Sequence, residues 1–231
     1  IPATRVARTG YKEEDLLDYG VDNLKADLTM SYKFNSDVRL DVTSRFSKGG
    51  SVLQADNRMR IENFIFHNHK AELSGKNYFV RAYATVEDAG DSYDSRFTAM
   101  NVNRAWKSDT AWFGQYNFAY FGFLDAMNWV YDSGNPLLPK LPGRIPEEMI
   151  PEPGDPVAAR EFADSDNSYI YNLFLNAADP NLSSQANVWE GTARYKPGTP
   201  EYEQTLNEVT NNTNWDNGGG KFVDKSQLYN L

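Results

Sequence analysis

The sequence alternates strictly between apolar and polar residues from position 24 to position 34. Its even positions are apolar and its odd positions are polar or charged: Leu24, Ala26, Leu28, Met30, Tyr32 and Phe34 against Lys25, Asp27, Thr29, Ser31 and Lys33. Because successive side chains of a β-strand point to opposite faces, this run predicts a strand with one apolar face and one polar face.

The alternation resumes after a short polar turn at residues 35–37. The second run has an apolar and a polar face of its own: Val38, Leu40, Val42 and Phe46 against Arg39, Asp41, Thr43 and Arg45. Two such runs predict a β-hairpin. Each run also has about the length that a tilted strand needs to cross a bilayer, roughly 9 to 11 residues. The pattern therefore raises the question whether protein or lipid covers the apolar face.

Composition argues against several classes of protein. The chain has 231 residues and a net charge of -9, without clustered Lys and Arg, which argues against a nucleic-acid binder. It has no cysteine, so a disulfide framework and a thiolate metal site are excluded. No apolar run approaches the roughly 18 residues of a membrane-spanning helix, so a membrane protein with this sequence would be a β-barrel. The chain begins without Met, and we expect it to be a segment of a longer protein.

Weaker alternation predicts further strands at residues 77–87, 96–106 and 111–122. The last of these runs also fits a helix, since Trp112, Tyr116 and Tyr120 recur every four residues. Residues 57–73 are the least regular stretch, and we expect a bulge or a strand boundary near His67. Short turns at 35–37, 74–77 and 107–109 alternate with longer connections at 49–59, at 88–95 and after 123.

Residues 123–219 differ in character from the strands, because they hold most of the prolines and show no alternation. Two short helices are expected there, at 157–163 after Asp155-Pro156 and at 201–209 after Thr199-Pro200. We divide the chain accordingly at residues 21, 122 and 219. If the strands belong to a membrane barrel, the four parts are an extracellular loop (1–21), barrel strands and turns (22–122), a long extracellular loop with short helices (123–219) and the start of the next barrel strand (220–231).

Two environments are open for the apolar face. A soluble antiparallel sheet would pack this face on a protein core. A transmembrane barrel would turn it to lipid, and three features favour that interpretation: long strands, short turns alternating with long loops, and aromatic residues near the short-turn end that resemble an aromatic girdle. Those aromatic residues are Tyr32, Phe34, Tyr78, Trp106 and Trp112.

Four further runs resemble the barrel of TonB-dependent outer-membrane receptors of the Bacteroidota. They are EDAGDSYDSRFTA at 87–99, NRAW at 103–106, PGTPEY at 197–202 and GKFVDKSQLY at 220–229. The resemblance implies a large barrel with an internal plug, ligand capture by extracellular loops, and energised import of a nutrient (a siderophore, an oligosaccharide or a peptide) across the bacterial outer membrane.

With this resemblance, we expect an all-β fold: an antiparallel transmembrane β-barrel segment of about five or six strands of a larger barrel, with one long, partly helical extracellular loop. The implied partners are the remainder of the barrel and its plug, the TonB energy-coupling protein, a surface lipoprotein, and lipid or lipopolysaccharide. No enzyme activity is expected. The alternatives are a soluble or surface-attached β-rich module that binds a glycan or another ligand, and a secreted hydrolase that uses clustered carboxylates.

Three groups of residues are candidates for binding. Aromatic residues of the long loop could stack on a ligand, or they could pack together as a core within the loop. They are Trp129, Tyr131, Trp189 and Trp215. Asp88, Asp91 and Asp94 could bind Ca²⁺, the one candidate cofactor, or form an acidic surface turn. His67 and His69 would share one face of a strand and could share a metal, although no third ligand is evident and paired interface histidines are the alternative.

Overall fold

The computed structural model describes residues 6–137, 143–167, 170, 193–213 and 219–221. Its strands are β1 (Asp22–Lys33), β2 (Arg39–Gln54), β3 (Arg58–Gly75), β4 (Tyr78–Asp88) and β5 (Tyr93–Asp94). Its helices are α1 (Ser95–Trp106), α2 (Asp109–Tyr120), α3 (Phe123–Ser133), α4 (Pro156–Asp164) and α6 (Pro200–Asn211), with short 3-10 turns η1 (Glu13–Asp15) and η2 (Glu147–Met149).

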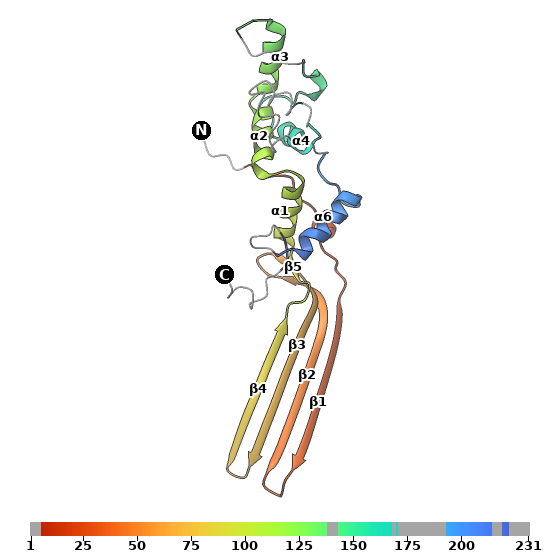
Figure 1. Cartoon of the computed structure of the whole chain (residues 1–231), viewed down its shortest axis with the longest axis vertical. Helices are drawn as coiled ribbons and strands as arrows, with labels where there is room; N and C mark the ends of the chain where they lie inside the picture. Colours follow the sequence, from red (N-terminus) through yellow and green to blue (C-terminus); the bar gives the residue numbers. More distant parts are fainter. Residues whose placement is uncertain (1–5, 138–142, 168–169, 171–192, 214–218, 222–231) are drawn as a thin grey trace. The chain divides into compact units, whose positions relative to one another are not determined.

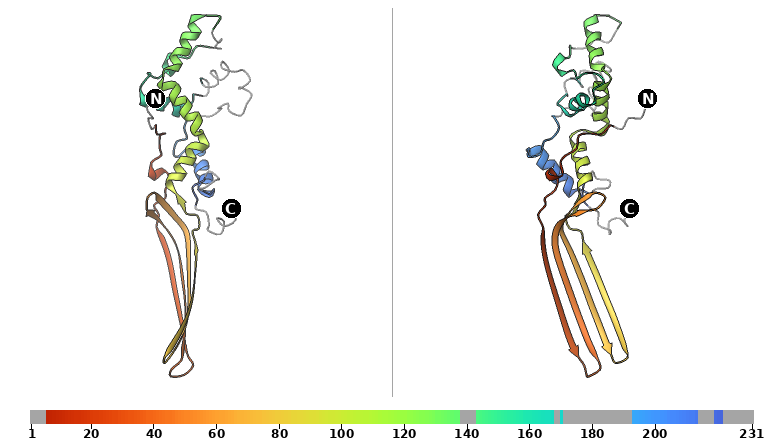
Figure 2. Two further views of the ribbon diagram at one scale, coloured as in Figure 1. Left: turned by 90° about the vertical axis from the view of Figure 1, so that its left-hand side faces the viewer. Right: turned by 180° about the vertical axis from the view of Figure 1, so that it is seen from behind.

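The strands form one antiparallel sheet in which β1, β2, β3 and β4 are neighbours in chain order, and β5 pairs with β3 (Figure 1). The four long strands lie in a single layer (Figure 2). Among the described residues the sheet is open, because the outer edges of β1 and β4 pair with no further strand. The strands predicted at 24–34, 38–46 and 77–87 are therefore confirmed as members of an antiparallel sheet.

The turn between β1 and β2 explains how the first hairpin keeps its register. The Asn35 side chain accepts hydrogen bonds from the backbone N–H groups of Asp37 (2.9 Å) and Val38 (2.8 Å). The Phe34 N–H donates to the Val38 carbonyl at 2.9 Å. An asparagine that closes its own turn in this way fixes where the second strand begins.

The bulge or strand boundary predicted near His67 is misplaced by a few residues, since the β2–β3 register shifts between Gly49 and Ser51 on β2 and between Ile61 and Phe64 on β3. A Cβ at Gly50 would lie 2.9 Å from the Ile61 carbonyl oxygen, so the close approach requires glycine. The prediction failed because it counted Phe64 and Phe66 as apolar-face residues. They lie opposite Gly49 and Ser47, on the polar face of the sheet.

The strands predicted at 96–106 and 111–122 are wrong, because these residues form α1 and α2. Asp94 begins α1 by accepting hydrogen bonds from the N–H groups of Arg96 and Phe97 at 2.8 and 3.0 Å. Ser108 begins α2 through its bond from the Ala111 N–H at 3.2 Å. The helical alternative for the second run is correct, and its buried stripe has helical spacing: Trp112, Gln115, Tyr116 and Ala119.

The helices after α2 are partly those expected. α4 and α6 confirm the short helices predicted at 157–163 and 201–209, and Asp155 begins α4 by accepting the Val157 N–H at 2.7 Å. α3 was not predicted, and it lies between two glycines with positive φ, Gly122 and Gly134. No helix within the described ranges is both long and apolar enough to span a membrane.

The chain divides into two compact units, each described by itself below. The helical unit comprises Ile1–Gly10 and Val102–Glu203, and the sheet unit comprises Tyr11–Asn101 and Gln204–Leu231. The helical unit has a core around Trp112, Leu124 and Ile145, each 1% exposed. The sheet unit has a small core at the loop end of the sheet, formed by Leu16, Leu17 and Tyr93 with Val52 packed against it.

Two further predictions need correction, and a third concerns residues that are mostly outside the described ranges. The all-β prediction does not hold, because the described part of the chain contains helices beside the sheet. Trp106 and Trp112 do not belong to an aromatic girdle, since both are buried in the helical unit. The strand predicted at 220–231 lies outside the described residues except for Gly220 and Lys221.

Candidate functional site

The strand register gathers the apolar residues of β1 to β4 on one face of the sheet. Directly opposed residues of an antiparallel pair share a face, and one row across the sheet consists of Tyr32, Leu40, Leu73 and Val80. Three more rows lie beside it: Met30, Val42, Ala71 and Ala82; Leu28, Ser44, His69 and Ala84; Ala26, Phe46, His67 and Val86. We call these four rows the apolar face.

Most large side chains on the apolar face of the outer strands are exposed. Leu28 is 62% exposed, Met30 65% and Val80 64%. None of them belongs to a hydrophobic core formed by the described residues. A contiguous exposed surface of this kind marks a place where something else, protein or lipid, covers the sheet.

The apolar face has a distinct margin at each end. At the loop end, the next row consists of Leu24, Lys48, Ile65 and Asp88, so charged residues first enter the face there. At the turn end, aromatic residues continue the face: the rings of Tyr32 and Phe34 meet edge to face at 5.0 Å, and Tyr78 is half exposed. Ten residue steps lie between Leu24 and Phe34, which corresponds to about 33 Å of extended strand.

Three polar residues interrupt the apolar face near its loop end. The Ser44 hydroxyl lies 3.0 Å from Nδ1 of His69, and the rings of His67 and His69 stack with their centroids 6.0 Å apart. The two histidines therefore share a face, as the sequence predicts. Among the described residues, no group of three or more potential ligands is placed to hold a metal ion.

The opposite face of the sheet carries most of the charged residues, together with the exposed aromatic residues Phe79 and Tyr83 of β4, and its charges pair across and along the strands. Arg45 and Asp27 lie 3.2 Å apart, and Glu72 contacts both Arg81 (2.7 Å) and Lys70 (3.0 Å). Exposed pairs of this kind each contribute at most about 1 kcal/mol. These charges favour hydration of this face, in contrast to the apolar face.

The structure does not bring the predicted ligand-binding aromatics together. Trp129 and Tyr131 lie on α3 and are 67% and 44% exposed. Trp189 and Trp215 lie outside the described residues. Ligand stacking on these residues therefore stays a prediction.

Each carboxylate of the predicted calcium site has a partner within the sheet unit. Asp88 accepts the Gly90 N–H at 2.9 Å, and Asp94 begins α1 and also accepts from Asn57. Asp91 pairs with Lys221 at 2.8 Å. Hydrogen bonds from Lys221 and then Asn63 lower the pKa of Asp91. These contacts explain the acidic run as turn and capping chemistry, and calcium binding stays a prediction.

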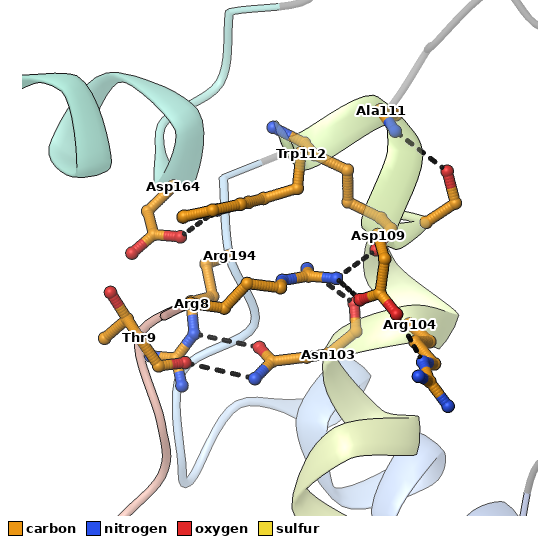
Figure 3. Close-up of polar contacts among 11 residues, drawn as sticks. Arg8, Thr9, Asn103, Arg104, Asp109, Ala111, Trp112, Asp164 and Arg194 are labelled. Carbon is orange, nitrogen blue, oxygen red and sulfur yellow. Dashed lines mark hydrogen bonds and ion pairs between the residues drawn. The ribbon is translucent and has the colours of Figure 1, made fainter. Parts of the chain in front are cut away.

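In the helical unit, Arg8 joins the end of α1 to the start of α2 (Figure 3). Its guanidinium donates to the carbonyls of Asn103 (3.0 Å) and Lys107 (2.8 Å) and to Asp109 (2.8 Å). A cation suits the carbonyl end of one helix, and Asp109 suits the N-terminal turn of the next. The guanidinium also lies over the Trp112 ring, 5.6 Å from its centroid.

Further polar contacts complete this cluster, which sequence reasoning missed. Asn103 donates to the Thr9 carbonyl at 3.1 Å, and the Trp112 indole N–H donates to Asp164 at 2.8 Å. Burial alone would raise the pKa of Asp109, but hydrogen bonds from Arg8 and Arg104 outweigh it and lower that pKa. All these groups hold elements together, so we interpret the cluster as structural.

Lys107 is a buried lysine at the break between α1 and α2, with 2% of its surface exposed. Its ammonium group donates to the Gln115 side chain and to the Ala163 carbonyl, both at 2.6 Å. It also lies 4.4 Å from the centroid of the Trp106 ring. Burial lowers the pKa of Lys107 to about 7, although Asp164 opposes the shift.

The helical unit contains a pocket of about 420 Å³ between η2 and α4. We call it the acidic pocket, and three of its lining side chains are carboxylates. Its lining residues are Glu148, Met149, Ile150, Pro151, Ala158, Glu161, Phe162, Ser165, Asp166, Asn167 and Ile170. Neither Trp129 nor Tyr131 belongs to it.

Comparisons with known proteins found no family model, no curated protein and no solved structure that matches the chain.

Proposed function

We propose that β1 to β4 are part of the wall of a TonB-dependent outer-membrane receptor that imports a nutrient, with the apolar face against lipid. The observation that carries this proposal is the exposed apolar surface of the sheet, which a barrel-like tilt would make about 25 Å tall from Leu24 to Phe34, between charged residues at the loop end and aromatic residues at the turn end. Barrels of this class have an apolar band about 25 Å tall with aromatic girdles.

The pairing of charges on the opposite face supports the same orientation. A lumen that holds water and a plug tolerates Arg45, Asp27 and Glu72, whereas lipid does not. The unpaired edges of β1 and β4 would each leave backbone groups without partners in lipid, at a cost of several kcal/mol per group. The remainder of the barrel would supply the neighbouring strands.

The chain order assigns the helical unit to the outside of the cell in this proposal. The short turns after β1 and β3 face the periplasm, and the chain enters the helical unit from the opposite end of the sheet through β5 and α1. Capture of the ligand then belongs to this unit. The receptor performs no chemistry on the ligand, the TonB protein supplies energy, and a surface lipoprotein can assist.

A second candidate is a soluble or surface-attached β-rich binding module. The observation that favours it is the polar interruption formed by Ser44, His67 and His69, which suits a protein interface better than hydrocarbon. In that case a second protein layer covers the apolar face. No observation favours a hydrolase.

Neighbouring positions of β1 allow a direct test, because the chain has no cysteine of its own. Leu28→Cys and Thr29→Cys are labelled with the same small fluorophore, and the full chain is placed in lipid vesicles. Leu28 is on the apolar face and Thr29 on the polar face. We expect quenchers attached to lipid tails to quench the label at position 28, and aqueous iodide to quench the label at position 29.

Two outcomes would contradict the proposal. A chain that stays monomeric and folded in buffer without detergent or lipid would exclude a membrane-spanning sheet. Equal iodide quenching at positions 28 and 29 in vesicles would show that lipid does not cover the apolar face.

A further inference from the structure

The acidic pocket has an apolar floor and a charged rim. Ile150, Ala158, Phe162 and Ile170 supply aliphatic and aromatic surface from η2, α4 and the chain that follows α4. Binding sites for small ligands commonly have this character, an apolar cavity of 300 to 1,000 Å³, roughly, with a few polar groups that fix orientation. The polar groups therefore decide which ligand fits.

Two polar side chains of the pocket already donate hydrogen bonds within the helical unit. The Ser165 hydroxyl and the Asn167 amide N–H both donate to the Phe162 carbonyl, each at 2.7 Å. Asn167 is 3% exposed, and its Oδ1 is a buried acceptor without a hydrogen-bond partner among the described residues. A buried acceptor left unsatisfied costs about 1 to 3 kcal/mol. Because the Asn167 Oδ1 has almost no accessible surface, the acceptors that the pocket offers to a ligand are the carboxylates of its rim.

The rim has a single sign of charge. Glu148, Glu161 and Asp166 are its ionisable groups, and no Lys, Arg or His is present among the described residues that line the pocket. This arrangement repels ferric chelates and phosphates that carry negative charge, and it attracts groups that are both positively charged and rich in N–H donors.

We propose that the acidic pocket binds a lysine or arginine side chain of a peptide ligand. The aliphatic stem of such a side chain packs on Ile150 and Phe162, and its charged end reaches the rim carboxylates. This inference deepens the proposed function, and it rests on that function only in identifying the peptide as the imported cargo. Binding itself depends on the helical unit alone.

Binding of three probes to the full chain tests the inference. We compare the peptide acetyl-Leu-Arg-Leu-amide with acetyl-Leu-Glu-Leu-amide and with maltotriose, using calorimetry. We expect binding of the arginine peptide only. Replacing both Glu148 and Glu161 by Gln should weaken that binding about tenfold, because both carboxylates attract the guanidinium. The effect should be no larger, because both carboxylates are exposed to solvent, which weakens the attraction.

Glu152→Gln is the matched control. Glu152 is an exposed carboxylate on the same segment and does not line the pocket, so its replacement should leave the affinity unchanged. Circular dichroism of each variant establishes that α4 is still folded. The three substitutions lie at exposed positions, so folding should not be lost.

Four results would overturn the pocket assignment: no binding of the arginine peptide, equal binding of the glutamate peptide, equal binding of maltotriose, or an unchanged affinity in the Glu148→Gln, Glu161→Gln variant. The fluorophore at position 28 reports separately on the sheet. If peptide binding is as expected and that label is not quenched by lipid, the pocket is correct and the import function fails.

Discussion

The sheet and the helical unit treat their large apolar side chains in opposite ways. Trp112 of α2 is 1% exposed and lies in a core that α4 completes, whereas Leu28 of β1 is 62% exposed. The helical unit therefore buries its apolar stripe within itself. The apolar face of the sheet needs a surrounding medium that the described residues do not supply.

This contrast separates two sources of stability. Buried apolar surface in the helical unit stabilises it in water. Within the described ranges, the sheet has a core of its own only at the loop end, around Tyr93. Along its length it relies on backbone pairing and on whatever covers the apolar face. The effect of a substitution in the sheet should therefore depend on what covers the apolar face, whereas the effect of one in the helical unit should not.

The largest expected effect is that of Trp112→Ala. The indole fills the core of the helical unit and donates to Asp164 at 2.8 Å, so we expect the free energy of unfolding to fall by about 3 to 5 kcal/mol. Urea unfolding followed by circular dichroism measures it. Phe113→Ala, on the exposed side of the same helix, is the control and should cost less than about 1 kcal/mol.

Next in size is Leu28→Arg, which tests the sheet as Trp112→Ala tests the helices. In lipid an arginine at the middle of the apolar face should cost about 2 to 4 kcal/mol, whereas Thr29→Arg on the polar face should cost little. Unfolding by urea from lipid vesicles gives both values. An equal loss of unfolding free energy at positions 28 and 29 would show that the two faces of the sheet do not differ in their environment.

A pH dependence is expected from the helical unit because Lys107 is buried there, facing Arg8, Asp164 and Asp166. Its pKa is about 7 in the folded chain and 10.5 ordinarily. Between these values the unfolded chain holds a proton that the folded chain has released, so the free energy of unfolding should rise with pH. The slope is at most about 1.4 kcal/mol per pH unit.

Urea unfolding between pH 7 and pH 9 checks this dependence on Lys107. Below about pH 7 both states are protonated, and the full cost of burying the charge is present. Lys107→Met should abolish the rise, and Lys196→Met, at an exposed position of the same unit, should preserve it. A rise that persists in Lys107→Met would assign the effect to another group.

The smallest effect compares two carboxylates of the sheet unit. Asp94→Ala removes the cap of α1 and should cost about 1 kcal/mol. Asp88→Ala loses one exposed turn contact and should cost less than about 0.5 kcal/mol. Thermal unfolding with and without calcium measures both. A large stabilisation by calcium that either substitution removes would instead establish the metal site.

The period of two predicted β1, β2 and β4 because one face of each strand is apolar and the other is polar. The same reasoning failed for α1, where Thr98, Asn101 and Asn103 are buried. Buried asparagine is possible there because backbone carbonyls accept from the amides: Gly219 from Asn101 and Thr9 from Asn103. A sequence pattern does not record such distant partners.

The candidate sites also differ in how far the sequence could predict them. The alternation indicated the apolar face, because every residue on it is local to a strand. The Arg8 cluster joins residues about a hundred positions apart, and no local signal marks it. The acidic residues of the pocket are visible in the sequence, but their common cavity depends on how η2, α4 and Ile170 pack together.

The paired register of the sheet restricts how its length can change. A deletion of one residue inside β2 would turn Arg45 to the side now held by Phe46, and would do the same to each later residue of that strand. Additions or losses within the strands should therefore come in twos. The turn at Asn35 and the connection between β2 and β3 are the places where odd numbers of residues can enter or leave without inverting the sheet.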